Sequence, residues 1–593
     1  MSKLWGVGLG PGDPELVTVK AARVIAEADV IAFHSARHGR SISRAIAAPY
    51  MREGQLEEHL VYPVTTETTD HPGGYQGAID EFYERAAALL ADHLAAGRTV
   101  ALLAAGDPLF YSSFMHMHRR LADRFDTEII PGVTSVSAAS AALGTPLVEG
   151  EQVLTVLPGT MPTEELTRRL RETDAAAIMK LGRTFPGVRQ ALSDSGRLDD
   201  AYYVERASST KQRILRAADV DDASVPYFAI TIVPGPQPAT RIPLTSAATD
   251  AAAMSEWKPA STTNESPGVD ADSTTRQQVA EIGAVAADSA AASQRDAITS
   301  ATGGATTGSA AETVAAQPNQ SSTSFATAPG VALGASTPPG ASRRDRVGEV
   351  VVVGLGPGAE GWTTPEVAQA LAEATDIVGY ATYVNRVLVR PGQRRHASDN
   401  RVESERAAMA LDMAKAGAKV VVVSSGDPGV FAMAAAVIEE SADPQWRDVP
   451  VRVLPGVTAA SAVASRMGAP LGHDFAMISL SDRLKPWETV AQRISAVASA
   501  DMAFAVYNPA SSQRQWQVAA MRELVLEHRK PETPVVIGRD VGGPTESVRV
   551  VSLADLDPAE VDMRTLLIVG ASTTTVFDAA GGPRVFTSRR YGD

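Results

Sequence analysis

The stretch Gly8-Leu9-Gly10-Pro11-Gly12 near the start of the chain returns far downstream as Gly354-Leu355-Gly356-Pro357-Gly358. Two more pairs follow in the same order, namely Gly106-Asp107-Pro108 with Gly426-Asp427-Pro428, and Pro131-Gly132-Val133-Thr134 with Pro455-Gly456-Val457-Thr458. The units of a solenoid recur every roughly 20–50 residues, so a period this long is typical of duplicated domains. The sequence therefore predicts two copies of one module in a single chain.

Each copy alternates predicted strands with predicted helices. The apolar runs at 99–104 and 419–424 lead directly into the Gly-Asp-Pro motifs, and such continuous runs are typical of parallel strands covered on both faces. The fold class is therefore α/β, with the repeated motifs in loops after strands, where such sheets bind ligands. The other predicted strands are 4–9, 30–33, 153–157, 176–180 and 228–233 in the first copy, and 350–355, 377–379, 502–507, 534–537 and 566–569 in the second.

Two helix starts follow the glycine motifs. Asp13-Pro14-Glu15 and Thr364-Pro365-Glu366 each combine a capping side chain, a proline at the first helical position and an acid in the first turn. These are the residue types that helix N-termini favour. We expect a helix to begin at each site.

The composition changes between the two copies. Residues 240–347 are rich in Ala, Ser, Thr, Gly and Pro and have almost no aromatic or large aliphatic side chains. Such a segment cannot bury enough apolar area to offset the entropy lost on ordering. The sequence therefore predicts a disordered linker at 240–347 between modules at 1–239 and 348–593.

Residue counts exclude several classes of function. The chain has 593 residues, with 54 Lys and Arg against 69 Asp and Glu and a formal net charge of −15. This balance argues against a generic nucleic-acid or anionic-membrane partner, and an anionic substrate must be held by local basic groups. The absence of cysteine excludes disulfides, thiolate catalysis and cysteine-ligated metals. With no apolar run long enough for a bilayer and no signal peptide, we expect a cytoplasmic protein.

The glycine loop departs from a dinucleotide-binding fingerprint. Asp13 stands where the third glycine is needed, and Pro11 removes an N–H donor that could hold a pyrophosphate. This disfavours a nucleotide-dependent oxidoreductase. In the Gly-Asp-Pro loops, the carboxylates of Asp107 and Asp427 could accept hydrogen bonds from a ligand, or each could cap the helix that follows.

These motifs resemble those of the tetrapyrrole methylases, enzymes that use S-adenosylmethionine in corrin and siroheme biosynthesis. The first copy is similar to precorrin-2 C20-methyltransferase and the second to precorrin-3B C17-methyltransferase, two activities that flank each other in one pathway. The stretches that carry the resemblance are 8–20, 106–114, 130–147, 157–160, 179–183, 203–207 and 226–228 in the first copy, and 424–431, 454–460, 468–480, 507–509, Trp516 and 561–563 in the second.

The resemblance implies that each copy has two α/β subdomains with the cofactor in the cleft between them. The subdomains are expected at about 1–145 and 146–239, and at about 348–468 and 469–593. Family members usually pair, so an internal pseudo-dimer or a homodimer is expected. The residues expected to contact S-adenosylmethionine are Pro11, Gly106, Asp107, Pro108, Thr134, Ser135, Leu181 and Ala207, and in the second copy Pro357, Gly426, Asp427, Pro428, Thr458, Ala459, Tyr507 and Gly538.

The resemblance also implies different chemistry in the two copies. Methylation at C17 accompanies contraction of the macrocycle, which removal of a proton from a ring hydroxyl would assist. His473 and Asp474 are the candidate catalytic pair, although Asp474 could instead cap a secondary-structure element. No essential base is assigned in the first copy. The precorrin-type substrates carry many carboxylates, and the candidate basic partners are Lys180, Arg183, Arg206 and Arg539, with Arg37, His38 and Arg40 as a second cluster.

Some alternatives stay open at this point. The same fold could act on cobalt-containing precursors of an oxygen-independent route, or one copy could be inactive and serve as a scaffold. His116 and His118 do not share a helical face, so we expect no protein-bound metal.

Overall fold

The computed structural model describes residues 2–36, 41–64, 69, 71–149, 152–236, 347–358, 360–399, 402–482, 485–511, 514–579 and 582–588. We call the described residues up to 236 the amino module and those from 347 the carboxyl module. The predicted linker, apart from Val347, lies outside the described residues. So do Arg37, His38 and Arg40.

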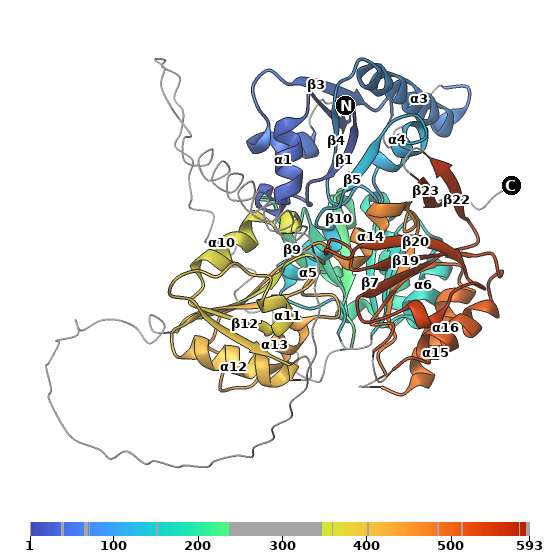
Figure 1. Cartoon of the computed structure of the whole chain (residues 1–593). Helices are drawn as coiled ribbons and strands as arrows, with labels where there is room; N and C mark the ends of the chain where they lie inside the picture. Colours follow the sequence, from blue (N-terminus) through green and yellow to red (C-terminus); the bar gives the residue numbers. More distant parts are fainter. Residues whose placement is uncertain are drawn as a thin grey trace, which may run out of the picture. The chain divides into compact units, whose positions relative to one another are not determined.

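The amino module begins with a sheet of five parallel strands in the order β3-β2-β4-β1-β5 (Figure 1). Alternate residues of β4 enter two different cores, with Leu102 in one and Leu103 in the other. Helices therefore cover both faces, which explains the continuous apolar run. The elements are β1 (Leu4–Gly8), α1 (Val19–Glu27), β2 (Val30–Ser35), α2 (Ile42–Ala47), β3 (Leu56–Val61), α3 (Gly74–Ala95), β4 (Val100–Ala104), α4 (Phe114–Leu121) and β5 (Thr127–Ile130).

The carboxyl module repeats this sheet in the order β13-β12-β14-β11-β15. Val350 and Val352 of β11 pack with α12 and α13, whereas Val351 and Val353 pack on the opposite face with α10 and α11. The elements are β11 (Glu349–Gly354), α10 (Pro365–Glu373), β12 (Asp376–Tyr380), α11 (Ala381–Val384), β13 (Arg394–Ser398), α12 (Glu403–Lys415), β14 (Lys419–Ser424), α13 (Met433–Ser441) and β15 (Val451–Leu454).

One of the two predicted helix starts lies where it was expected, and the other does not. Thr364 caps α10 as expected, since its Oγ1 accepts a hydrogen bond from the amide of Val367. Asp13 caps only a short 3-10 turn, and α1 begins later, where Thr18 Oγ1 accepts a hydrogen bond from the amide of Ala21 at 3.2 Å. The edge strands β3 and β13 were not predicted, because their polar sequences carry no continuous apolar run.

The second subdomains of the two modules have equivalent strands. In the amino module they follow α5 (Ser135–Leu143) and contain β6 (Leu154–Pro158), α6 (Thr163–Glu172), β7 (Ala175–Met179), α7 (Phe185–Asp194), β8 (Tyr202–Glu205), β9 (Arg213–Arg216) and β10 (Ala229–Val233). In the carboxyl module they follow α14 (Ala459–Met467) and contain β17 (Phe475–Ser479), α15 (Trp487–Ser499), β18 (Ala503–Tyr507), α16 (Gln517–Leu526), β19 (Pro534–Arg539), β20 (Ser547–Ser552) and β21 (Thr565–Val569).

One sheet runs through both modules. Its ten strands follow the order β20-β19-β21-β18-β17-β6-β7-β10-β8-β9, and the modules meet where β6 and β17 pair antiparallel, with Phe475 opposite Val156. One hydrophobic cluster also contains side chains of both modules, such as Leu154 and Met477. The two copies are therefore joined edge to edge in a single sheet and share a core.

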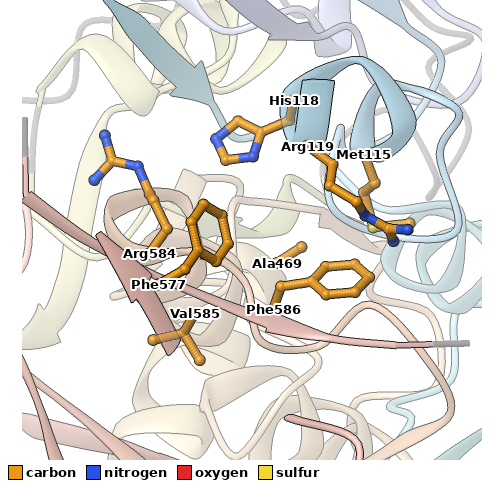
Figure 2. Close-up of a pocket in the computed structure, with 8 residues that line it drawn as sticks. All are labelled: Met115, His118, Arg119, Ala469, Phe577, Arg584, Val585 and Phe586. Carbon is orange, nitrogen blue, oxygen red and sulfur yellow. The ribbon is translucent and has the colours of Figure 1, made fainter. Parts of the chain in front are cut away.

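A small sheet near the carboxyl end also contacts the amino module. It consists of β16 (Gly468–Ala469), β22 (Thr574–Ala579) and β23 (Gly582–Thr587). The guanidinium of Arg119 in α4 lies over the ring of Phe586 at 4.0 Å from its centroid. Both side chains line a small cavity (Figure 2). Its volume of about 10 Å³ has room for roughly one water molecule.

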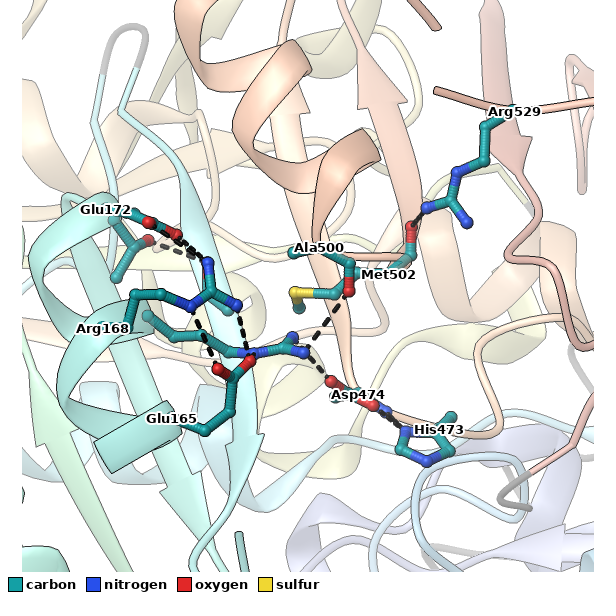
Figure 3. A network of polar contacts seen from close by, with 11 residues as sticks. Glu165, Arg168, Glu172, His473, Asp474, Ala500, Met502 and Arg529 are labelled. Carbon is teal, nitrogen blue, oxygen red and sulfur yellow. Dashed lines mark hydrogen bonds and ion pairs between the residues drawn. The ribbon is translucent and has the colours of Figure 1, made fainter. Parts of the chain in front are cut away.

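A buried ion pair crosses the boundary between the modules next to β17 (Figure 3). Arg169 of α6 donates from Nη1 to Oδ2 of Asp474 at 2.8 Å, and the Asp474 side chain is 3% exposed. Arg169 also donates to Glu165 and to the carbonyl of Ala500. On its other side, the Asp474 carboxylate contacts Nδ1 of His473. Charged side chains of both modules therefore belong to one network of ion pairs and hydrogen bonds.

Arg169→Met is expected to lower the free energy of unfolding by about 3–5 kcal/mol, because it removes the guanidinium that pairs with the buried Asp474 carboxylate and leaves only His473 beside it. Arg168→Met is the matched control. Arg168 is the next residue along α6, it is 46% exposed, and it also bonds Glu165. Loss of such an exposed pair costs about 0–1 kcal/mol. Urea unfolding followed by circular dichroism measures both changes, and equal losses would contradict a structural role for the Arg169–Asp474 pair.

Candidate functional site

The glycine loop and the Gly-Asp-Pro loop are hydrogen-bonded to each other in both modules. In the amino module, the amide of Gly106 donates to the carbonyl of Gly10 at 2.7 Å, and the amide of Gly10 donates back at 3.3 Å. Gly356 and Gly426 form the equivalent bridge in the carboxyl module. All four glycines have φ between 67° and 75°, a region that side chains disfavour. The repeated glycines are therefore needed for this junction.

A buried aspartate links the Gly-Asp-Pro loop to the loop that follows the next strand along the chain, which is β5 in the amino module and β15 in the carboxyl module. Oδ1 of Asp107 accepts a hydrogen bond from the amide of Leu109 at 2.8 Å, and Oδ2 accepts one from the amide of Gly132 at 3.0 Å. Asp427 accepts the amides of Gly429 at 2.9 Å and Gly456 at 3.0 Å. Each carboxylate thus acts as a clamp between two loops, and the structure shows its oxygens bonded within the protein.

Burial raises the pKa of Asp107 to about 7 and the pKa of Asp427 to about 6, while the amide donors act in the opposite direction. Both side chains are almost fully buried. The amides therefore provide the main compensation for the cost of burying these carboxylates.

One face of each Gly-Asp-Pro loop is open. A Cβ atom built on Gly106 would meet no atom within 4 Å, and one on Gly426 would meet only backbone atoms at 3.8 Å. By contrast, a Cβ on Gly132 would lie 2.3 Å from the carbonyl oxygen of Gly106. The loops pack backbone to backbone on one side and leave open space beside Gly106 and Gly426 on the other.

The Pro-Gly-Val-Thr loops lead into helices α5 and α14. Thr134 and Thr458 are the N-caps, and their Oγ1 atoms accept the amides of Ser137 and Ser461 at 3.1 Å. The threonine hydroxyls are therefore used for capping, while Ser135 and Ala459 stand at the first helical positions. The sequence identified both threonines but not this role.

The second subdomain reaches the same loops. A Cβ on Gly12 would lie 2.9 Å from the carbonyl oxygen of Ala207, so the loop containing Pro11 touches the loop after β8. Leu181 follows β7 and is buried. In the carboxyl module, a Cβ on Gly358 would lie 2.6 Å from the backbone of Gly542. The two subdomains therefore meet beside the glycine loops in both modules.

Tyr507 brings the two subdomains of the carboxyl module together at the start of α14. Its hydroxyl accepts the amide of Ala460 at 3.2 Å, and its ring lies 5.1 Å from that of Phe431. Burial raises the pKa of this tyrosine well above its ordinary value. Gly538 lies within β19, where a Cβ would be 2.5 Å from the side chain of Val463. It therefore allows β19 to pack closely on α14.

Arg386 is a site residue that the sequence analysis did not identify. Its guanidinium donates to the carbonyls of Leu355, Gly356 and Gly358 at 3.0–3.4 Å and to the hydroxyl of Ser425 at 3.3 Å. It follows the short helix α11 and holds the glycine loop against the Gly-Asp-Pro loop. Its partners are mainly backbone carbonyls, which leave no signal in the sequence.

The predicted substrate-binding cations have different surroundings. Lys180 has a φ of 58°, and its Nζ lies 4.5 Å from the ring centroid of Tyr111, so it spans the two subdomains. Arg183 lies in the short 3-10 turn after β7. Arg206 forms an ion pair with Glu205, and Arg539 donates to Asp562 at 2.8 and 3.0 Å. These last two are held by acids of their own subdomains.

The predicted catalytic pair lies away from Tyr507. His473 and Asp474 precede β17, whereas Tyr507 is opposite Ser479 at the other end of this strand. A strand of this length separates the two positions by roughly 15 Å. The structure thus places Asp474 in the ion pair with Arg169 at the module boundary. A catalytic role for the pair stays a prediction.

The predicted absence of a metal site concerned His116 and His118. The ring of His116 stacks on Tyr83 at 4.2 Å. His118 is buried beside the cavity of Figure 2, and burial, together with Arg584, lowers its pKa to about 4. Within the described ranges, no group of three or more His, Asp or Glu side chains is placed to hold a metal ion. The helices of the described ranges are all too short or too polar to cross a membrane.

The family model for tetrapyrrole (corrin/porphyrin) methylases matches residues 3–220 and 349–557. The chain is 53% identical over 592 residues to the cobalamin biosynthesis protein CobIJ of Mycobacterium tuberculosis, which covers 99% of this chain and 96% of that protein. The precorrin-2 C(20)-methyltransferase of Sinorhizobium sp is 50% identical over 40% of this chain and 96% of its own length. The precorrin-3B C(17)-methyltransferase of Sinorhizobium sp is 47% identical over 41% of this chain and 97% of its own length. Both the matched ranges and the full-length relative show that the chain belongs to the tetrapyrrole (corrin/porphyrin) methylases.

Proposed function

We propose that the chain is a bifunctional S-adenosylmethionine-dependent methyltransferase of corrin biosynthesis. The amino module methylates precorrin-2 at C20, and the carboxyl module methylates precorrin-3B at C17 with ring contraction. The observation that carries this proposal is that each module has its own complete set of clamped loops around an open glycine. Relatives with these two activities match about two fifths of the chain each, which supports one transfer per module.

The loops described above fit S-adenosylmethionine. The open faces at Gly106 and Gly426 leave room beside the backbone, and small side chains such as Ser135 and Ala459 border the helix starts. We assign cofactor contacts in the amino module to Pro11, Gly106, Asp107, Pro108, Thr134, Ser135, Leu181 and Ala207. In the carboxyl module we assign them to Pro357, Gly426, Asp427, Pro428, Thr458, Ala459, Tyr507 and Gly538. Of these residues, Asp107, Asp427 and the two threonines also hold the loops in shape.

When bound, S-adenosylmethionine supplies an electrophilic methyl group. The protein's task is to hold the acceptor carbon of the macrocycle in line with it, and orientation of this kind contributes roughly 7–11 kcal/mol to catalysis. Rigid loops serve this task because they fix the binding surface before the ligands arrive. Lys180 and Arg183 supply positive charge for the substrate carboxylates in an otherwise acidic chain, and Arg206 and Arg539 do so when the substrate takes the place of Glu205 and Asp562.

Replacing each clamp separately should remove one transfer and leave the other. Asp107→Ala leaves the amides of Leu109 and Gly132 without their acceptor, and Asp427→Ala does the same to Gly429 and Gly456. Each unsatisfied buried group costs about 1–3 kcal/mol. We therefore expect Asp107→Ala to lose methylation of precorrin-2 at C20 at least tenfold while C17 methylation of precorrin-3B persists, and Asp427→Ala to show the reverse. The measurement is transfer of a ¹³C-methyl label, located by NMR.

The matching aspartate-to-asparagine variants keep one acceptor oxygen and should lose less activity than the alanine variants. If either alanine variant abolished both transfers or neither, the assignment of one transfer to each module would be wrong. Parallel incubation with cobalt-containing precursors tests the oxygen-independent alternative. Faster labelling of those compounds would show that they, and not the metal-free precorrins, are the substrates.

Arg386→Met should raise the KM for S-adenosylmethionine in the C17 reaction about tenfold, because it removes charge-assisted hydrogen bonds worth roughly 1.5–3 kcal/mol from the glycine loop. Arg390 lies in the same segment and is exposed, so Arg390→Met is the control and should leave this KM unchanged. Steady-state kinetics with precorrin-3B measure both. A normal KM in Arg386→Met would show that this arginine does not shape the cofactor loop.

His473 and Asp474 remain our candidate pair for assisting ring contraction, and His473 is the more exposed of the two. His473→Ala is expected to slow formation of the ring-contracted product more than it weakens binding of S-adenosylmethionine. The product is followed by its absorbance and the affinity by calorimetry. Wild-type turnover in His473→Ala would exclude His473 from the reaction.

A further inference from the structure

The Gly-Asp-Pro loop of the carboxyl module lies against helix α5 of the amino module. A Cβ built on Gly429 would be 3.2 Å from Oγ of Ser140 and 3.2 Å from Oδ1 of Asp427. The next residue, Val430, forms a parallel bridge with Val148. The carboxyl-module loop therefore has the amino module as its outer wall.

This wall is fixed in place. The hydroxyl of Ser140 donates to the carbonyl of Thr145 at 2.6 Å, which holds its oxygen at the end of α5. Gly429 donates its amide to Asp427, the same carboxylate that accepts the amide of Gly456. A displacement of Gly429 would therefore pull on the clamp between the two loops of the proposed cofactor site.

The Gly-Asp-Pro loop of the amino module also contacts the carboxyl module, but through a different kind of interaction. Phe110, in the corresponding loop of the amino module, meets the ring of Phe475 edge to face with centroids 5.2 Å apart. A ring contact can shift without breaking a hydrogen bond, whereas Gly429 is confined between Ser140 and Asp427. The two modules therefore support each other's loops through different kinds of contact.

We propose that the amino module completes the cofactor site of the carboxyl module, with Ser140 as a positioning residue for the loop of Gly429 and Asp427. This inference rests on the proposed function, because it assumes that this loop holds S-adenosylmethionine. Helix α5 then serves both modules. Its first turn, at Ser135, borders the amino-module site, and its last turn, at Ser140, supports the loop of the carboxyl-module site.

A rescue experiment tests this role. Gly429→Ala places a methyl group against Ser140. Overpacking of this tight contact should weaken binding of S-adenosylmethionine at the carboxyl-module site about tenfold, while the amino-module site keeps its affinity. Ser140→Ala removes one of the two facing oxygens and leaves Asp427 Oδ1 in place, so the double variant should recover part of the lost affinity. Isothermal titration of the full chain measures both sites, and the Asp107→Ala background, in which the amino-module site is weakened, identifies the affected site.

Ser465→Ala is the matched control for the rescue. Ser465 is a buried serine of α14 whose hydroxyl donates to Ala462 within the same helix, so its loss should not restore binding to Gly429→Ala. As a second approach from the amino module, Ser140→Val should by itself weaken the carboxyl-module site. Thermal unfolding of each variant shows whether it is folded.

The outcomes separate the two proposals. Wild-type affinity in both Gly429→Ala and Ser140→Val, or equal rescue by Ser140→Ala and Ser465→Ala, would overturn the role of Ser140. Absence of S-adenosylmethionine binding at both sites of the unmodified chain would instead overturn the proposed function.

Discussion

The arrangement of each proposed site depends on one buried carboxylate that accepts backbone amides from two loops. Asp107 and Asp427 have little solvent around them and no basic side chain among their described hydrogen-bond partners, so the amides must offset the cost of burial. The same bonds join the end of β4 to the end of β5, and the end of β14 to the end of β15. A methyl transfer that works by orientation needs such a fixed surface, and here the surface is made mainly of backbone.

The sequence predicted the duplicated α/β modules, because glycines at positive φ and apolar strands buried on both faces leave strong local patterns. It also identified the loops of the proposed site. It did not predict how Asp107 is used, since a carboxylate that faces a ligand and one that binds the amide of Gly132 look the same in one sequence. Arg386 was missed because its acceptors are mainly carbonyls. The partner of Asp474 was not predictable either, because Arg169 lies 305 residues away in the chain.

The shared sheet also explains how its edges are protected. An unpaired strand edge can template aggregation, and proteins commonly protect edges with charged side chains. β6 and β17 cover each other, so neither has an exposed edge at the boundary. The outermost strands of the sheet, β9 and β20, contain Arg213, Arg216 and Arg549. Charge therefore protects the outer edges, while pairing between modules protects the inner ones.

The pairing of β6 with β17 sets a delay during synthesis of the chain. Ribosomes add about 5–20 residues per second, so the 305 residues between Arg169 and Asp474 take roughly 15–60 s to translate. Throughout that interval β6 has no β17 to pair with, and Arg169 has no Asp474 to bind. A nascent chain in this state is a natural client for chaperones, and crowding of ribosomes on one messenger would bring several such edges together.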